Sequence, residues 1–411
     1  MILDPDLRPS CHWIGLGDKV VFLEALLVSL AVLGLALVTV LAAQVMMAIV
    51  TVRTPKIFQG RRPRVAVLMP AHNEVAVIAE TLASILPQLV EGDRLLVVAD
   101  NCSDETATIA RKLGAEVVER TDLECRGKGY ALDFGVGRMR DDPPEVVIII
   151  DADCQISPGV IDRLARTCVE TSRPVQALYL MHSPEGAGLK TRIAEFAWVV
   201  KNQVRPLGCH RLGLPCQLMG TGMAFPWAAI SNVALASGHI VEDMKFGIDL
   251  ALAGYPAVFC PDATVTSYFP GDKTAEGTQR TRWEHGHLSM ILDEFPRVLA
   301  CAIRERNVRL LGLAIDLVVP PLALLALIVT VIFSLNLMFF LFEDITWPLN
   351  LSLVTLGLFA TAITVAWYGW GRKVISFLAM LTIPFYILSK FPLYLRFLTK
   401  RQKSWVKTER D

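Results

Sequence analysis

The sequence has no excess of either charge and lacks the short motifs of several common protein classes. Its 40 Lys and Arg residues balance 40 Asp and Glu residues, so no basic surplus points to a nucleic-acid partner. The nine cysteines include no C-x-x-C pair, and the spacing of Cys209 and Cys216 fits no zinc pattern well. Cytosolic thiols stay reduced, so we expect no disulfide framework. Internal repeats and low-complexity stretches are also absent from the chain.

Charged residues are scarce, at 19%, whereas hydrophobic residues make up 53% and the mean hydropathy is +0.46. This apolar excess predicts an integral membrane protein rather than an ordinary soluble one. The apolar residues gather in runs that reach the roughly 20 residues a helix needs to cross a bilayer. We expect transmembrane helices at 20–50, 310–342 and 347–370, and a fourth transmembrane or re-entrant, interfacial helix at 374–397.

Acidic residues precede the first of these runs. Asp4, Asp6 and Asp18 stand where a signal peptide would have basic residues, which favours an uncleaved anchor over a cleaved leader. The loops between the runs differ in the same way: Lys and Arg gather at 53–64, 304–309 and 372–373, and are absent from 343–346.

Basic loops stay in the cytosol, so these charges predict an orientation. We expect residues 1–19 outside and residues 60–300 inside, in a multi-pass protein of the cytoplasmic (inner) membrane. The tail at 398–411 is basic and is also expected in the cytosol. A cytosolic tail favours three full crossings, with residues 374–397 in the interface.

Between the apolar ends lies a segment of alternating strand and helix patterns. The expected strands are 65–69, 94–99, 117–118 and 146–150, and the expected helices are 75–86, 104–113, 130–139 and, further along, 244–253. This alternation predicts an α/β domain with a mainly parallel sheet and helices on both faces. A dinucleotide-binding Rossmann domain is disfavoured, because the first strand is followed by Pro-Ala-His-Asn-Glu and not by G-x-G-x-x-G.

Two carboxylates follow the most apolar of these strands. Asp151 and Asp153 alternate at its end, so both can face the same way. Such oxygen ligands suit a hard divalent cation, Mg²⁺ or Mn²⁺, which would bridge the phosphates of a nucleotide sugar. A solvated strand end is the alternative, since D-x-D is a common sequence, but the apolar strand before it favours a functional site.

Two further groups have both a structural and a functional interpretation. Lys128 lies at a helix start between two glycines, where it is either an ordinary basic helix start or a group that approaches a diphosphate closely. The spacing around it excludes a Walker A motif. Glu242 and Asp243 precede a helix, and acidic residues are favoured in a first helical turn whatever their function.

A Q-x-x-R-W stretch, residues 279–283, gives these groups a common interpretation. On its own it is a weak signal, since Arg and Trp often meet at a membrane surface. Here it follows Asp100, the D-x-D pair and the E-D pair in that order, and Gly286 extends it to Q-R-x-R-W-x-x-G. Over residues 60–300 the chain thus resembles the membrane-bound family 2 glycosyltransferases, which include the cellulose, chitin and hyaluronan synthases. The resemblance implies a GT-A domain with a mainly parallel sheet, flanked by transmembrane α-helices at both ends.

The resemblance also implies which residues bind the donor. Asp153 would be the metal ligand and Asp151 would support the donor sugar or diphosphate. Lys128, in a G-K-x-x-A-L element, would contact the diphosphate. Glu74 and Asp100 would hold the ribose and the base, although the family often has Asp or Gly where this chain has an Asn after the acid.

By the same resemblance, Asp243 beside Glu242 would be the catalytic base, and Arg282 would neutralise charge on the departing diphosphate. Trp283 would offer an apolar face to the acceptor sugar. The other residues expected around the acceptor are Gln279, Gly220 and Thr221. His285 and His287, which follow the motif, are expected to be polar residues of an interfacial loop.

The activity implied is inverting transfer of a sugar from a nucleoside-diphosphate sugar, UDP-linked, to a lipid-linked oligosaccharide or polysaccharide acceptor in exopolysaccharide or cell-envelope glycan synthesis. The expected partners are this donor, this acceptor, membrane lipids and other polysaccharide-assembly proteins, with no nucleic acid. A processive synthase that extrudes its polymer is the alternative that Q-x-x-R-W favours, whereas the small number of helices favours the lipid-linked acceptor. A non-catalytic nucleotide-binding membrane protein is the alternative from a different class.

Overall fold

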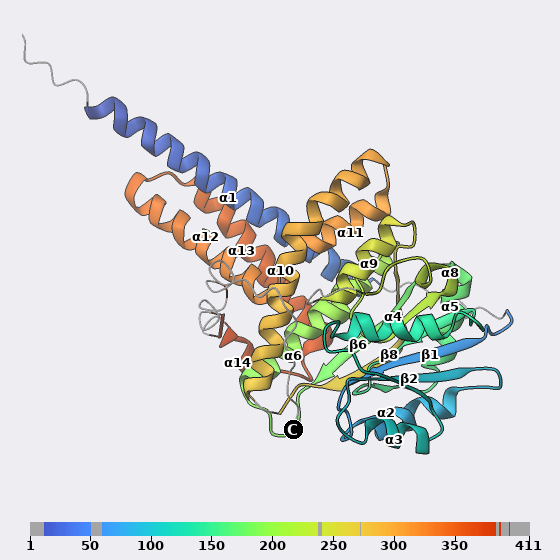
Figure 1. Ribbon diagram of the computed structural model, residues 1–411. Coiled ribbons are helices and arrows are strands. Elements are labelled where there is room, and N and C mark those ends of the chain that lie inside the picture. Colours follow the sequence, from blue (N-terminus) through green and yellow to red (C-terminus); the bar gives the residue numbers. More distant parts are fainter. Residues whose placement is uncertain are drawn as a thin grey trace, which may run out of the picture.

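The computed structural model describes residues 12–50, 60–236, 241–271, 273–383, 386–387 and 394. It shows an α/β body next to a bundle of long helices (Figure 1). The tail at 398–411, most of the N-terminal stretch and the basic residues at 53–56 lie outside the described residues, so the expectations for them stay predictions.

The strands of the described residues form one eight-stranded sheet with the order β3-β2-β1-β4-β7-β6-β8-β5. Their bounds are β1 Val65–Ala71, β2 Arg94–Asp100, β3 Glu116–Arg120, β4 Val146–Ile149, β5 Gln155–Ile156, β6 Val175–His182, β7 Met223–Pro226 and β8 Val258–Tyr268. The four strands expected from the sequence are β1 to β4, and they pair in parallel.

The other half of the sheet is mixed. β7 pairs antiparallel with both β4 and β6, and β5 pairs antiparallel with β8, while β6 and β8 are parallel. The sequence analysis did not predict these strands, because they do not alternate regularly with helices along the chain. The sheet is therefore less parallel than expected, and β7 brings the chain from 220 onward beside the end of β4.

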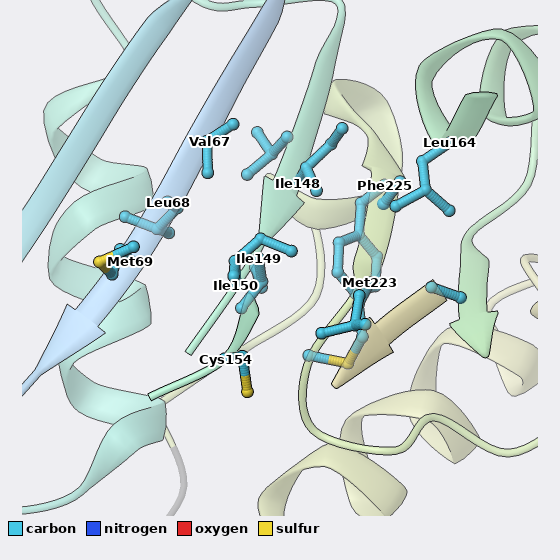
Figure 2. Close-up of a cluster of buried hydrophobic side chains, with 14 of the residues drawn as sticks. Val67, Leu68, Met69, Ile148, Ile149, Ile150, Cys154, Leu164, Met223 and Phe225 are labelled. Atoms are coloured by element: carbon cyan, nitrogen blue, oxygen red, sulfur yellow. The ribbon is translucent and has the colours of Figure 1, made fainter. Parts of the chain in front are cut away.

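The core lies where apolar strand residues meet the helices that cover the sheet. Val67, Leu68, Ile148 and Phe225 have no exposed surface and pack together (Figure 2). Helix α4 comes close enough to β1 that a Cβ atom on its Gly135 would lie 2.4 Å from a Leu68 methyl carbon. The central strands are thereby held rigidly, which fixes the positions of the side chains at their ends.

The helices of the body, including one 3₁₀ and one π turn, are α2 Ile78–Ile85, η1 Leu86–Gln88, α3 Thr106–Lys112, α4 Lys128–Arg138, α5 Val160–Thr171, α6 Leu189–Val199, η2 Val200–Val204, α7 Arg205–Arg211, α8 Trp227–Ile230 and α9 Glu242–Leu252. Those predicted from periodicity appear as α2, α3, α4 and α9, with ends shifted by a few residues. The chain continues in α10 Lys273–Arg304, α11 Val308–Val318, α12 Leu322–Glu343, α13 Trp347–Ala366, η3 Trp367–Gly371 and α14 Phe377–Met380.

Helix α1, His12–Ile49, lies against α12 and α13 (Figure 1). Among the described residues, three helices are long and apolar enough to cross a membrane: Asp18–Ile49, Leu322–Glu343 and Trp347–Gly371. The run at 310–342 was expected to be one helix and is instead two, α11 and α12. Pro320 and Pro321 separate them, because proline lacks the amide proton of a helix interior and disfavours helix in the residue before it. Much of 374–397 lies outside the described residues.

The Q-x-x-R-W stretch lies on a helix and not on a loop. It belongs to α10, a 32-residue helix that also carries His285 and His287. Because both histidines lie on this helix and are buried, at 2% and 3% exposure, the expectation of an interfacial loop is wrong. Nε2 of His287 donates a hydrogen bond to the carbonyl oxygen of Leu317, 3.3 Å away, which joins α10 to α11.

Candidate active site

The D-x-D carboxylates lie in the turn that follows β4, as expected. Thr81 of α2 donates a hydrogen bond of 2.7 Å to the carbonyl oxygen of Ala152 and thereby fixes this turn. Ligand atoms of Asp151, Asp153 and Cys154 lie within 4.8 Å of one another. The cluster thus offers two carboxylates at the carboxyl end of a central strand, where open α/β sheets bind their ligands.

These side chains fit a hard divalent cation. Burial, and then repulsion from Asp153, raise the pKa of Asp151, although the ammonium of Lys128 opposes the rise. A cation between the two carboxylates would remove the repulsion and favour the charged forms. Burial raises the pKa of the Cys154 thiol well above its usual value, so this thiol stays protonated and is a poor ligand. The remaining oxygen donors suit Mg²⁺ or Mn²⁺.

Lys128 connects the D-x-D turn with the turn at Gly220. Its ammonium forms an ion pair with Asp151 and donates a hydrogen bond of 2.8 Å to the carbonyl oxygen of Gly220. Burial by itself lowers the pKa of Lys128, but the carboxylates of Asp151, Glu242 and Asp243 raise it above its usual value. The site therefore holds a charged ammonium between acidic groups from two different parts of the chain.

The Gly220–Gly222 turn is held by a residue that the sequence analysis did not single out. Gln176 of β6 is fully buried, donates to the carbonyl oxygen of Thr221 at 2.9 Å and accepts from the amide of Met219 at 2.8 Å. The hydroxyl of Thr221 accepts from the amide of Asp151 at 3.0 Å. The turn and the D-x-D pair are therefore positioned by one hydrogen-bonded unit.

Glu242 and Asp243 occupy the first turn of α9. Burial and the charge of Asp243 raise the pKa of Glu242 to about 7, against the opposing charges of Lys128 and Arg282. Oδ2 of Asp243 lies 3.4 Å from the position that a Cβ atom on Gly220 would take. Asp243 thus faces the glycine turn.

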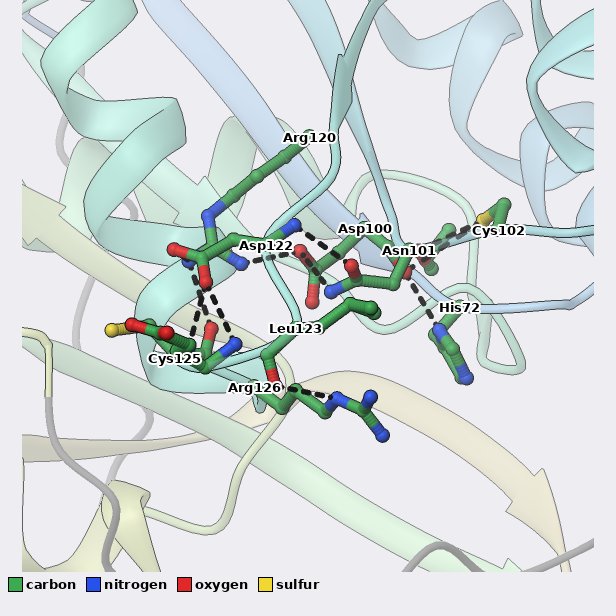
Figure 3. Close-up of polar contacts among 11 residues, drawn as sticks. His72, Asp100, Asn101, Cys102, Arg120, Asp122, Leu123, Cys125 and Arg126 are labelled. Atoms are coloured by element: carbon green, nitrogen blue, oxygen red, sulfur yellow. Dashed lines mark hydrogen bonds and ion pairs between the residues drawn. The ribbon is translucent and has the colours of Figure 1, made fainter.

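Asp100 belongs to a second polar group at the ends of β2 and β3 (Figure 3). Its Oδ1 accepts hydrogen bonds from Arg120 at 2.6 Å and from the side-chain amide of Asn101 at 3.1 Å. Arg120 also pairs with Asp122 at 2.9 Å. The carboxylate of Asp100 is therefore fixed by Arg120 and Asn101. It does not cap a helix, since α3 begins only at Thr106.

Glu74 follows β1 and lies near this second group. Its amide donates to the hydroxyl of Thr106 at 2.8 Å, and the ring of His72 contacts the carbonyl oxygen of Asp100 at 2.6 Å. These contacts hold the loop after β1 against the loop after β2. Glu74 and Asp100 thus lie at the ends of neighbouring strands.

Helix α10 brings the Q-x-x-R-W residues to the first group. The charge of Arg282 acts on Glu242, so the two lie close enough to interact electrostatically. Trp283 packs against Trp198 of α6 with ring centres 4.7 Å apart. Gln279 is buried at 4% exposure, and Arg280 donates to the hydroxyl of Tyr386 at 3.1 Å. In this arrangement Arg282 lies near Glu242 and Trp283 packs on Trp198, whereas Arg280 reaches toward the C-terminal segment.

The site thus lies at the carboxyl ends of the strands in an α/β domain. It consists of the D-x-D turn, the acidic pair Glu242 and Asp243, and the helix that carries Arg282 and Trp283. A model of the family described as glycosyltransferase like family 2 matches residues 63–286, more than half of the 411 residues. The chain belongs to glycosyltransferase family 2. The matched region includes both polar groups and ends within α10, beyond Trp283.

Individual relatives agree with this family. The probable glycosyltransferase YdaM of Bacillus subtilis is 25% identical over 240 residues, and the match spans 56% of each chain. An N-acetylglucosaminyltransferase of Sinorhizobium fredii is 25% identical over 310 residues, which are 69% of this chain and 73% of that protein.

A solved structure shows the same fold. It is the mannosyltransferase PcManGT of Pyrobaculum calidifontis in complex with GDP-Man and Mn²⁺, with a TM-score of 0.56 at 16% identity, and the match covers 92% of this chain and all of that one. At this identity the likeness shows the fold alone. It confirms the GT-A architecture that the motifs implied.

A cavity of about 130 Å³ lies beside Trp283 of this family 2 site. Trp198, Trp283 and Lys201 contribute to its wall from the transferase body and α10. Leu41 of α1 and Leu322 of α12 contribute from two of the candidate membrane helices. The cavity therefore lies where the transferase domain meets the apolar bundle.

Four residues of the site were not predicted. Arg120 ends β3, and it was missed because the strand was expected to stop at residue 118. Gln176 is a lone polar residue in an apolar strand, which is itself a signal of a buried hydrogen-bonding role. Trp198 and Lys201 belong to a segment with no recognisable motif, and only the packing of α6 against α10 shows their place.

Proposed function

We propose that this chain is an inverting, metal-dependent glycosyltransferase of the cytoplasmic membrane. It would transfer a sugar from a nucleoside-diphosphate sugar, UDP-linked, to a lipid-linked oligosaccharide or polysaccharide acceptor in exopolysaccharide or cell-envelope glycan synthesis. The observation that carries the proposal is the meeting of Asp151, Gly220, Glu242 and Asp243 around the ammonium of Lys128. Donor-binding and acceptor-facing groups thereby converge on one point.

The proposed roles follow from this arrangement. Asp151 and Asp153 would hold Mg²⁺ or Mn²⁺, which when bound supplies positive charge against the donor diphosphate. PcManGT, with the same fold, is solved with Mn²⁺. Lys128 and Arg282 would stabilise the charge that develops on the diphosphate as its bond to C1 of the sugar breaks. Glu74 and Asp100 would hold the ribose and base, with Arg120 fixing the Asp100 carboxylate.

On the acceptor side, Asp243 would take the proton of the acceptor hydroxyl while that oxygen attacks C1. Burial and the charge of Asp243 raise the pKa of Glu242 to about 7, so Glu242 is only partly ionised near neutral pH. Trp283 would stack on the acceptor sugar. Gly220 and Thr221 would let that sugar approach the backbone, and Gln279 would help to close the site.

The membrane location is proposed from the three candidate spans and the basic residues beside them. A phosphatase reporter inserted within 343–347 should be active outside, and one inserted at 60 should be inactive. The reverse pattern would overturn the orientation and remove the domain from cytosolic sugar nucleotides.

The function itself is tested by measuring UDP release from UDP-sugars by purified protein, with GDP-mannose as the competing donor. Donor-dependent release that requires Mg²⁺ or Mn²⁺ is expected. Absence of any release, despite nucleotide binding, would instead support the non-catalytic alternative. Product size in isolated membranes then separates the acceptors: one added sugar indicates the lipid-linked acceptor, and a ladder of long chains indicates a processive synthase.

A further inference from the structure

The lining of the cavity beside Trp283 combines apolar and charged groups. Leu41 of α1 and Leu322 of α12 contribute apolar surface from two of the candidate membrane helices. The same lining includes the aromatic ring of Trp283, the ammonium of Lys201 and the carboxylate of Glu284. A ligand that fills this space therefore meets both hydrocarbon and charged groups.

Lys201 is the unusual member of this lining. Its Nζ lies 5.2 Å from the centre of the Trp198 ring, and it makes no hydrogen bond or ion pair with any residue that the structure describes. Burial lowers its pKa, and the nearby Arg205 lowers it further, against the opposing charges of Asp243 and Asp316. A cation in such surroundings is costly unless an anion accompanies it.

The two arginines of the cavity already have partners within the protein. Arg205 pairs with Asp316 at 2.8 Å, and Arg280 donates to Tyr386 at 3.1 Å. Lys201 also lies in the π turn η2, a backbone irregularity that is often found at functional sites. Lys201 is therefore the group in this wall whose charge is available to a ligand.

We propose that this cavity binds the phosphate-bearing head of a membrane lipid through Lys201, with the lipid chain leaving along α1 and α12. The inference rests on the proposed function and specifies its acceptor: a lipid with a phosphate between its apolar chain and the sugar that is extended. The phosphate lies by Lys201, and the sugar beyond it lies on Trp283, toward Asp243. Two observations support this placement: Lys201 and Trp283 line the same cavity as residues of α1 and α12, and the charge of Asp243 acts on Lys201.

The size of the cavity agrees with a head group and excludes a buried chain. Its volume of about 130 Å³ is near the ~150 Å³ of a protein cavity that accepts a benzene ring. A phosphate group fits such a space, whereas a chain of ten or more carbons does not. The chain must therefore lie outside it, against the exposed apolar surfaces of the membrane helices.

The proposal is tested by calorimetric titration of the full chain in an uncharged detergent, without nucleotide, using dodecyl phosphate, dodecanol and inorganic phosphate. Dodecyl phosphate should bind the natural protein at least about 10-fold more tightly than dodecanol, and inorganic phosphate should not saturate the site. Equal binding of dodecanol and dodecyl phosphate would refute the cation's role. Inorganic phosphate that binds as tightly as dodecyl phosphate would refute the lipid.

Lys201→Met removes the charge and keeps much of the side-chain length, so it should abolish the preference for dodecyl phosphate over dodecanol. Lys201→Arg should retain a preference. Lys190→Met is the matched control, since Lys190 is exposed on α6, and it should behave as the natural protein. A Lys201→Met protein that keeps the full preference overturns the assignment. If that variant does not fold, the three ligands on the natural protein still decide the question.

The lipid site and the proposed sugar transfer can be refuted independently of each other. Binding of dodecyl phosphate through Lys201 in a protein that releases no UDP from any donor would keep the lipid site and refute sugar transfer. Donor turnover in a protein without phosphate selectivity would refute the lipid site and keep the transferase.

Discussion

Arg205 of α7 and Asp316 of α11 form an ion pair of 2.8 Å in which both side chains are less than a tenth exposed. Gln44, a polar residue in the apolar helix α1, bonds to both: its amide donates to Asp316 at 2.7 Å and its carbonyl accepts from Arg205 at 2.9 Å. Gln217 donates to the other oxygen of Asp316 at 2.6 Å. This buried network fastens helix α1, a candidate membrane span, to the transferase body.

Loss of one member of this network should destabilise the protein strongly. Asp316→Ala leaves the Arg205 guanidinium buried without its counter-charge, a change that typically costs about 3–5 kcal/mol. We expect a large fall of the melting temperature in detergent. Asp142→Ala, which removes an exposed ion pair with Arg64, should cost at most about 1 kcal/mol. Similar melting temperatures for the two variants would contradict the structural role of the network.

Removal of metal should abolish sugar transfer, and Mg²⁺ or Mn²⁺ should restore it. Asp153→Asn should lower turnover by orders of magnitude, because the donor diphosphate loses its principal counter-charge. Asp133→Asn, on the exposed face of α4, serves as the control and should leave turnover unchanged. Initial rates in EDTA and after addition of each metal test this, and near-normal rates in EDTA would remove the metal from the mechanism.

Base catalysis and diphosphate binding should respond to different substitutions. Asp243→Asn keeps size but cannot accept a proton, so kcat should fall roughly 10²-fold or more, since general-base catalysis contributes about 10²–10⁴-fold. Its affinity for UDP should barely change. Arg282→Ala should weaken both UDP binding and turnover. Calorimetry with UDP beside initial rates checks the pair, and the opposite pattern would mean that the two roles are interchanged.

Glu242 should make stability depend on pH in a predictable direction. Its pKa is about 7 in the folded protein against an ordinary 4.5, so the folded state holds a proton that the unfolded state has lost. The free energy of unfolding should therefore fall as pH rises from about 4.5 to 7 and change no further from this cause. Glu242→Gln cannot titrate, so its melting temperature should fall less across this window. Glu91→Gln, at an exposed position, should keep the full dependence.

Gly222 should tolerate a side chain less well than another glycine with a positive φ. Gly222 has φ +65°, and a Cβ atom there would lie 2.8 Å from carbon atoms of Ala177 and Val265. Gly114 has φ +94° and open space around it. Gly114→Ala should cost about 1–2 kcal/mol from backbone strain, and Gly222→Ala a further ~1–3 kcal/mol from overpacking. Melting temperatures of the two variants give the comparison, and equal losses would contradict the tight packing of this turn.

The sequence alone predicts the elements whose physical causes are local. β1 to β4 are short apolar runs followed by polar residues, and parallel strands carry such residues to one edge of the sheet. The positions of Asp100, Asp151 and Asp153 at strand ends follow from this pattern. The order of the motifs implied the family, which the family model confirms.

Local sequence patterns did not predict the parts of the structure that depend on pairing between distant segments. β7 inserts antiparallel between β4 and β6, which no alternation of strand and helix announces, and this insertion places Gly220 beside Lys128. The Q-x-x-R-W residues were expected to be followed by a loop, but they lie on a continuous helix whose histidines are buried against neighbouring elements. Pro320 and Pro321 divide the apolar run into α11 and α12, whereas the length of the run predicted a single helix.

Thus the sequence determined the residue types at the strand ends, the apolar helices and the family, because hydrophobic period and motif order are properties of the chain itself. Only the tertiary structure decided which charges meet. The pairing of Arg205 with Asp316 and the exposure of Lys201 to a cavity depend on side chains brought together from distant segments. Their energies arise from burial and from removal of water, which exist only after the segments have packed.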